Sequence, residues 1–262
     1  MHCWRAAQLD ATSSLPAVNR DEEIERRRLS FGPVAALYDS VRPSYPEPAV
    51  RWMLGDTPVR VADLGAGTGI FSRVLARVGH DVVAVEPDEG MRSALLAHHP
   101  GFEVLEGSGE AIPLPDGSVD AVTAAQSFHW FDNPAAHAEI ARVLRPGGHL
   151  CPLWNVRDES VEWVAELGRV AGLEDGTRHP EHESPAIELG PQFGPAGRAL
   201  FEHATTLTRD QLLPLVQSRS QYIIATDAEK AELEARISQI ADALPEAIEL
   251  PYVTTAFRAA RL

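Results

Sequence analysis

A glycine-rich turn is the part of the sequence best suited to bind a ligand. It reads DLGAGTG from Asp63 to Gly69, between an apolar run and a helical pattern. Glycine lacks a side chain, so a ligand can approach this backbone closely. A dinucleotide-binding turn follows G-x-G-x-x-G, but here Ile70 stands where the third glycine is expected. Asp63 suits a ligand with an ammonium group and would repel a phosphate, so a pyrophosphate is not the favoured ligand. A turn needed only for helix packing is the alternative.

Glu86 is the second candidate for ligand binding. It ends the next predicted strand, 17 residues after Gly69. An acid at this place can accept hydrogen bonds from both hydroxyl groups of a ribose. An acid that merely ends a strand in solvent is the alternative, but the separation from the glycine turn favours the ribose.

The elements that must position these residues alternate along the chain. Five apolar strands are predicted at 59–64, 81–86, 102–105, 119–125 and 149–154, with helical patterns between them. This alternation predicts an α/β fold with a doubly wound, mostly parallel sheet that binds ligands at the carboxyl ends of its strands. Later strands at 201–207 and 252–261 make seven, the last of them antiparallel. Helical patterns from 208 to 244 predict a cap over the acceptor site.

Several motifs in this order resemble the class I S-adenosylmethionine-dependent methyltransferases, in particular the type-11 branch of small-molecule enzymes. The matching motifs are Asp63 to Gly69, Val85-Glu86-Pro87, Gly107 to Pro113, Gln126 to Phe131, and Leu144 to Gly148. The resemblance is good over 31–158 and weaker beyond. It implies a Rossmann-like methyltransferase fold, S-adenosylmethionine as methyl donor, S-adenosylhomocysteine as product, and a small-molecule acceptor.

The resemblance also implies roles for individual residues. The glycine turn would hold the methionine moiety, Glu86 the ribose, and the loop from Ser108 to Glu110 the adenine. Many relatives carry Asp at the position of Ser108, so the adenine contact would depend more on backbone groups or on Glu110. An N-terminal lid would cover the cofactor, with Arg42 paired to the methionine carboxylate; a surface arginine among packed tyrosines is the alternative. The expected cofactor-binding set is Tyr38, Arg42, Asp63, Gly65, Ala66, Gly67, Gly69, Glu86, Pro87, Met91, Ser108, Gly109, Glu110, Gln126, Ser127 and Phe128.

An aromatic cluster after the fourth strand marks where the acceptor should meet the methyl group. Within it, His129 has an unperturbed pKa that suits a base at neutral pH, so we expect a base or an orienting residue there. A packing histidine between aromatic residues is the alternative. The expected acceptor pocket comprises Tyr45, Trp130, Phe131, Asn155 and Arg157.

Composition limits the partners. The formal net charge of the 262 residues is −15, so the chain has no general attraction for nucleic acid. No apolar run approaches the roughly 20 residues that cross a bilayer, and no secretory signal is visible, which together predict a cytoplasmic protein. His179 and His182 stand in a predicted loop without the spacing of a metal site on a helix, so no metal is expected. We expect a monomer or homodimer.

The chain is expected to divide into a tail (1–20), a helical lid (21–58), a cofactor-binding core (59–207), a helical cap (208–248) and a final core strand (249–262). The predicted function is methyl transfer to a small acceptor, such as a natural product or a metabolite with a carboxylate or hydroxyl group. Two rivals are an NAD-dependent oxidoreductase, which Ile70 disfavours, and a non-catalytic methyltransferase-like binding protein.

Overall fold

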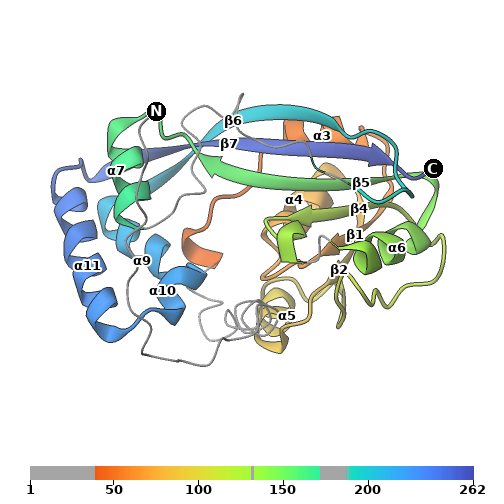
Figure 1. Ribbon diagram of the computed structural model, residues 1–262, viewed down its shortest axis with the longest axis horizontal. Helices are drawn as coiled ribbons and strands as arrows, with labels where there is room; N and C mark the ends of the chain where they lie inside the picture. The colour runs from red at the N-terminus through yellow and green to blue at the C-terminus, as the bar shows by residue number, and fades with distance from the viewer. Residues whose placement is uncertain (1–38, 131–132, 172–186, 188) are drawn as a thin grey trace, which may run out of the picture.

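A seven-stranded sheet organises the molecule (Figure 1). The computed structural model describes residues 39–130, 133–171, 187 and 189–262. The strands lie in the order β3-β2-β1-β4-β5-β7-β6. Strands β1 to β5 pair in parallel, while β7 is antiparallel to both β5 and β6. The predicted fold class, a mostly parallel α/β sheet with one antiparallel strand near the end, is confirmed.

The strands are β1 (Arg60–Leu64), β2 (Asp81–Val85), β3 (Glu103–Leu105), β4 (Val119–Ala125), β5 (Leu144–Arg157), β6 (Gly197–Thr208) and β7 (Ala247–Ala260). The α-helices are α3 (Glu47–Leu54), α4 (Ile70–Val78), α5 (Glu89–His98), α6 (Pro134–Val143), α7 (Glu162–Val170), α9 (Leu212–Gln217), α10 (Ser220–Ile224) and α11 (Asp227–Asp242). Two short 3-10 helices are η2 (Phe128–Trp130) and η3 (Arg209–Gln211).

Helices cover both faces of the sheet because successive strand residues point to opposite sides. One hydrophobic cluster joins Ala62, Val83 and Val122 to α6. The residue that precedes each of these three in the chain belongs to a second cluster, which packs against α3 and α4. The inner strands β1, β2 and β4 are therefore buried on both faces, as expected for a parallel sheet with crossover helices.

A third hydrophobic cluster lies where β5 ends and β7 begins. It joins α7, α9 and α11 to the start of β7, and includes Leu212 and Ile237, both fully buried. Figure 1 shows these helices gathered beside α10 at one end of the molecule, away from α4 and α6. We call the segment from η3 to α11 the cap.

The structure differs from the predicted elements at several boundaries. The strand predicted at 149–154 begins earlier, because residues 144–148 also belong to β5, where the pairing with β4 shifts register between Val119 and Ala121. The turn chemistry of Arg145-Pro146-Gly147-Gly148 therefore produces an irregularity within the strand. β6 and β7 are also longer than predicted, because they pair with each other over twelve residue positions from Gly197 to Thr208.

Candidate cofactor and acceptor site

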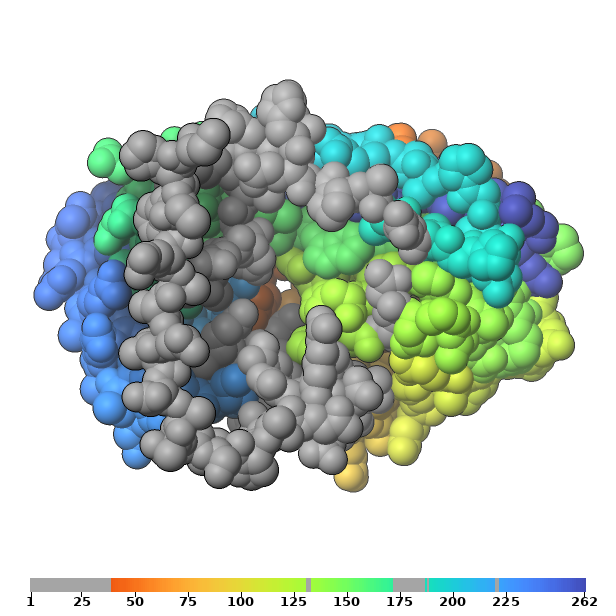
Figure 2. Space-filling model, in the orientation of Figure 1, coloured from red at the N-terminus to blue at the C-terminus, as the bar shows by residue number. Residues whose placement is uncertain are grey.

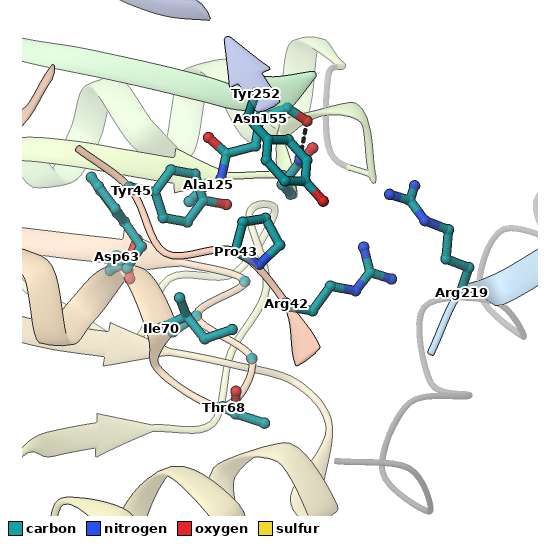
Figure 3. Close-up of a pocket in the computed structure, with 15 residues that line it drawn as sticks. Arg42, Pro43, Tyr45, Asp63, Thr68, Ile70, Ala125, Asn155, Arg219 and Tyr252 are labelled. Carbon is teal, nitrogen blue, oxygen red and sulfur yellow. Dashed lines mark hydrogen bonds between the residues drawn. The ribbon is translucent and has the colours of Figure 1, made fainter. Parts of the chain in front are cut away.

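A pocket opens at the carboxyl ends of β1, β4 and β5, between the sheet and the cap (Figure 3). Figure 2 shows the blue cap and the yellow-green core at opposite sides of this face of the molecule. Five parts of the chain supply the lining: the lid segment, the glycine turn with the start of α4, the ends of β4 and β5, the α9–α10 junction, and β7. The lining residues are Arg42, Pro43, Tyr45, Asp63, Gly65, Ala66, Gly67, Thr68, Ile70, Phe71, Ala125, Gln126, Asn155, Arg219 and Tyr252.

The glycine turn takes a backbone form that needs glycine. Gly65, Gly67 and Gly69 have φ angles of 64°, 57° and 83°, in the left-handed region that side chains disfavour. A Cβ built on Gly67 would meet no atom within 4 Å, so open space adjoins the turn on the pocket side. A Cβ on Gly69 would lie 2.8 Å from Cγ of Leu95, so this third glycine is needed for packing against α5. The turn is thus shaped both for its helix contact and for a close ligand.

Asp63 lies beneath the turn and is only 1% exposed. Its two carboxylate oxygens accept hydrogen bonds from the hydroxyls of Ser72, at 2.6 Å, and Thr123, at 2.8 Å. Burial raises the pKa of Asp63 to about 6, and the two hydroxyls oppose that rise. The carboxylate therefore ties β1 to β4 and α4, and any contact with a ligand ammonium would have to use its remaining lone pairs.

Glu86 links the turn after β1 to the segment after β2. One carboxylate oxygen accepts the N–H of Gly67 and the other accepts the N–H of Asp88, each at 2.9 Å. Burial raises the pKa of Glu86, while these two backbone hydrogen bonds lower it. Each oxygen keeps a further lone pair, so the carboxylate can accept hydrogen bonds from two ribose hydroxyls. Asp88 in turn caps α5 by accepting the N–H of Met91.

The expected adenine-binding loop is held by its own backbone. Ser108 and Ala111 exchange two backbone hydrogen bonds, of 3.3 and 3.2 Å. Glu110 accepts a hydrogen bond from the side chain of Asn133, which caps α6. Gly109 is buried, Pro87 is half-buried and Met91 is 4% exposed. These residues lie outside the pocket lining above, as do Gly69 and Glu86.

The three predicted residues after β4 have different surroundings. Gln126 lines the pocket with an unusual φ of 57° and donates its side-chain amide to the carbonyl of Asn155 at 2.7 Å. Such strain in a residue other than glycine is typical of functional sites. Ser127 instead donates to the carbonyl of Leu64, and Phe128 is 1% exposed in the core, where its ring stacks on His137. Of the three, only Gln126 reaches this pocket.

The lid segment is attached at three places. Asp39 accepts hydrogen bonds from Thr68 and Arg73 beside the glycine turn, each at 2.8 Å. The side-chain amide of Asn155 donates to the carbonyl of Ser44 at 3.0 Å. Arg42 donates to the hydroxyl and the carbonyl of Ser218, at the end of α9, at 3.0 and 2.9 Å. Arg42 therefore lines the pocket while joining the lid to the cap.

The predicted acceptor residues do not all meet in the pocket. Tyr45 and Asn155 line it, and the Tyr45 ring packs edge-on against Phe71. Arg157 lies outside the lining, 3% exposed and 3.9 Å from a carboxylate oxygen of Glu159. Trp130 packs against the core cluster that contains α6. His129 is exposed, with its ring beside that of Trp130, so the structure does not bring it to the pocket.

Some predicted residues fall outside the described parts of the chain, namely Tyr38, Phe131, His179 and His182. Conversely, the pocket contains residues that were not predicted to line it: Pro43, Thr68, Ile70, Phe71, Ala125, Arg219 and Tyr252. Thr68 and Ile70 belong to the glycine motif and could have been included from it. Arg219 and Tyr252 come from the cap and from β7, and no local motif signals them.

These features together define a class of protein. The sheet has the strand order β3-β2-β1-β4-β5-β7-β6, a glycine turn follows β1, and a buried acid follows β2. A family model described as a methyltransferase domain matches residues 62–151. An uncharacterized methyltransferase of Mycobacterium tuberculosis is 41% identical over 236 residues, which cover 88% of this chain and 95% of that protein. The chain belongs to the class I S-adenosylmethionine-dependent methyltransferases, type-11 branch, and S-adenosylmethionine is its methyl donor.

Two further comparisons extend this result. A solved structure from Anaeromyxobacter dehalogenans, described as a type II methyltransferase, is similar with a TM-score of 0.59 and 26% identity, covering 84% of this chain and 97% of that one. A malonyl-[acyl-carrier protein] O-methyltransferase of Methylococcus capsulatus is 38% identical over 133 residues, or 47% of this chain and 48% of that protein.

Two kinds of feature are absent from the described residues. The helices there are all too short or too polar to cross a bilayer. Nor do three or more His, Cys, Asp or Glu side chains come together, in those parts of the chain, in a way that could hold a metal ion.

Proposed function

We propose that this methyltransferase acts on a small-molecule acceptor bound between the core and the cap. The observation that carries the proposal is the composition of the pocket. It joins the glycine turn, through Gly65 to Thr68, to side chains of β5, β7 and the cap. A ligand on the turn would therefore have space beside it for a second molecule, in contact with Asn155, Arg219 and Tyr252.

Different residues of the chain would bind and orient different parts of the methyl donor. S-adenosylmethionine supplies a methyl group on a positively charged sulfur. The open side of the glycine turn would hold its methionine part, and Glu86 would accept from its ribose hydroxyls. Arg42 would pair with its carboxylate, and Ser108 to Glu110 would border its adenine. Lid and cap together would exclude water and align the acceptor, which is the main requirement for an in-line displacement.

The proposal includes a division of the chain. The lid comprises 21–58, the core 59–207 with 249–262, and the cap 208–248. We also propose a cytoplasmic location and a monomer or homodimer. The acidic net charge of −15 supports the further proposal that the protein does not bind nucleic acid. The O-methyltransferase relative favours oxygen as the methylated atom.

Calorimetry and a transfer assay test the proposal together. We expect S-adenosylhomocysteine to bind with one-to-one stoichiometry and NAD not to bind. Candidate small acceptors would then be incubated with enzyme and methyl-labelled S-adenosylmethionine, and mass spectrometry should find the label in a small molecule. Binding of NAD in place of S-adenosylhomocysteine would overturn the cofactor assignment. Cofactor binding with label found only in macromolecules would overturn the acceptor assignment.

A further inference from the structure

Two arginines come together at the end of the pocket nearest the cap. Arg42 belongs to the lid and hydrogen-bonds Ser218, the residue immediately before Arg219. Both arginines line the pocket. Figure 3 shows their guanidinium groups close to Tyr252, with Arg42 on the side of Thr68 and Ile70 and Arg219 farther out, on the cap. Arg42 therefore lies nearer the glycine turn, and Arg219 lies nearer the cap.

The charge of this lining is opposite to that of the whole chain. Among the described lining residues, Asp63 is the one acid, and it is buried beneath the turn with both oxygens accepting hydroxyl hydrogens. The two guanidinium groups stay charged at every physiological pH. A protein with a net charge of −15 thus presents a locally cationic pocket wall. Such a wall favours a bound anion and fixes its orientation through guanidinium hydrogen bonds.

The described residues that line the pocket also include no evident base. The lining they form contains no histidine, lysine or glutamate. His203 lies in a hydrogen-bond network behind the wall, where it contacts Thr254 at 3.0 Å and Asn155 at 3.3 Å. Transfer to a neutral hydroxyl or to an ammonium group would require proton removal. A carboxylate is already an ionised nucleophile and requires none.

We propose that Arg219 binds a carboxylate of the acceptor and presents it for methylation. The proposal rests on the proposed function and names its substrate class, a carboxylic acid. One carboxylate oxygen forms a bond to the methyl carbon while the carbon–sulfur bond breaks, and the electron pair of that bond remains on sulfur. The negative charge of the acceptor and the positive charge of the sulfonium cancel. The products are a methyl ester and a thioether, and no proton moves.

A binding experiment tests the arginine without knowledge of the full acceptor. The enzyme is first saturated with S-adenosylhomocysteine, so that the cofactor's carboxylate site is filled. Acetate, acetamide, inorganic phosphate and sodium chloride are then titrated in turn. Binding is followed through the Nε–H signal of Arg219 in nitrogen-15 NMR spectra, which the variant Arg219→Lys identifies. We expect a saturable shift with acetate and none beyond the salt effect with acetamide.

Matched variants separate this proposal from the proposed function. Arg219→Gln should weaken acetate binding by about tenfold or more, the loss expected for a charge-assisted hydrogen bond. Its affinity for S-adenosylhomocysteine should stay close to that of the wild type. Arg209→Gln removes an exposed arginine on the same cap, outside the pocket, and should change neither. Acetate binding is followed in these variants through perturbed backbone amides.

Each remaining outcome is decisive. A shift with acetate that only matches sodium chloride overturns the carboxylate site, and stronger binding of phosphate than of acetate overturns its chemical class. A loss of cofactor affinity in Arg219→Gln would assign this arginine to the cofactor instead. If the wild type binds no S-adenosylhomocysteine, the proposed function itself fails. Finally, dilute alkali should release the label of the transferred methyl group as methanol, and a label that resists alkali would contradict ester formation.

Discussion

Glu86 holds two backbone segments together through one carboxylate, and each oxygen keeps a lone pair that can accept from a ribose hydroxyl. Replacing it with alanine removes these acceptors. We expect Glu86→Ala to weaken S-adenosylhomocysteine binding by about 1.5–3 kcal/mol, the range for hydrogen bonds to a charged group. Calorimetry measures the effect. Glu89→Ala, an exposed acid three residues later, is the matched control and should bind as the wild type does. Normal affinity in folded Glu86→Ala would refute the ribose assignment.

Asp63 gives the stability of the protein a pH dependence of known sign. Its pKa of about 6 lies above the usual 3.8, so the folded state holds this proton more tightly than the unfolded state. The stability that protonation contributes is present at low pH and is lost as the pH rises through about 6. Relative to Asp63→Asn, which does not titrate, the wild type should lose about 1.4 kcal/mol of unfolding free energy between about pH 5 and pH 7.5. Urea unfolding at several pH values measures both proteins, and parallel profiles would contradict the raised pKa.

The position of His129 in the structure changes the effect that we expect from replacing it. It is exposed and does not line the pocket, and a carboxylate acceptor needs no base. A general base contributes about 10²–10⁴-fold to the rate, so His129→Ala should keep most of the wild-type turnover and the same pH profile. Turnover with the acceptor found in the transfer assay measures this. A hundredfold loss, with a changed acidic limb of the profile, would restore His129 as the base.

The irregular start of β5 depends on a glycine that backbone atoms surround. A Cβ at Gly148 would lie 2.7 Å from the carbonyl oxygen of Asp120 and 3.0 Å from that of Arg145. Backbone atoms in a sheet cannot move aside cheaply, so Gly148→Ala should destabilise the fold by about 1–3 kcal/mol. Gly101→Ala is the control, because a Cβ there meets nothing within 4 Å. Thermal and urea unfolding should separate the two, and equal stabilities would mean that the strand relaxes.

The elements with strong local signals could be predicted from the sequence. α4 runs from Ile70 to Val78 and ends at Gly79, as its apolar spacing and terminal glycine indicate. Asn133 and Thr226 cap their helices through side-chain hydrogen bonds, which is what short polar residues do at that position. The full lengths of β6 and β7 could not be predicted, because each strand is defined by its pairing with the other.

The pocket could be predicted only on its cofactor side, where one local motif supplies the lining. Arg219 reaches the site because the cap packs against α7 and the start of β7, and Tyr252 because β7 inserts between β5 and β6. Both arrangements depend on contacts between segments far apart in the chain. The same limit explains His129: the sequence places it next to Phe128, but only packing shows that Phe128 takes the buried position and leaves His129 exposed.

At the scale of the whole molecule, the lid and the cap are joined to each other beside the pocket. The cap has its own hydrophobic cluster, which includes Val41 of the lid. Arg42 adds two hydrogen bonds to Ser218, while Asp39 attaches the same segment to the glycine turn. A ligand bound to the glycine turn would therefore stabilise the position of the cap through only a few residues of the lid. This arrangement predicts that both parts respond together to the cofactor.

Hydrogen exchange can measure this coupling. We expect amides in 39–46 and in 212–224 to exchange more slowly when S-adenosylhomocysteine is added, because ligand contacts with the turn and Arg42 stabilise the joined lid and cap. Ser218→Ala removes the hydroxyl that accepts from Arg42 Nε but keeps the backbone carbonyl that accepts from Nη2. This variant should keep the slowing in 39–46 and lose part of it in 212–224. Ser238→Ala, on the exposed face of α11, is the control and should behave as the wild type. Slowing confined to 39–46 in the wild type would show that the lid binds the cofactor without the cap, and the two parts would then have to be treated as independent.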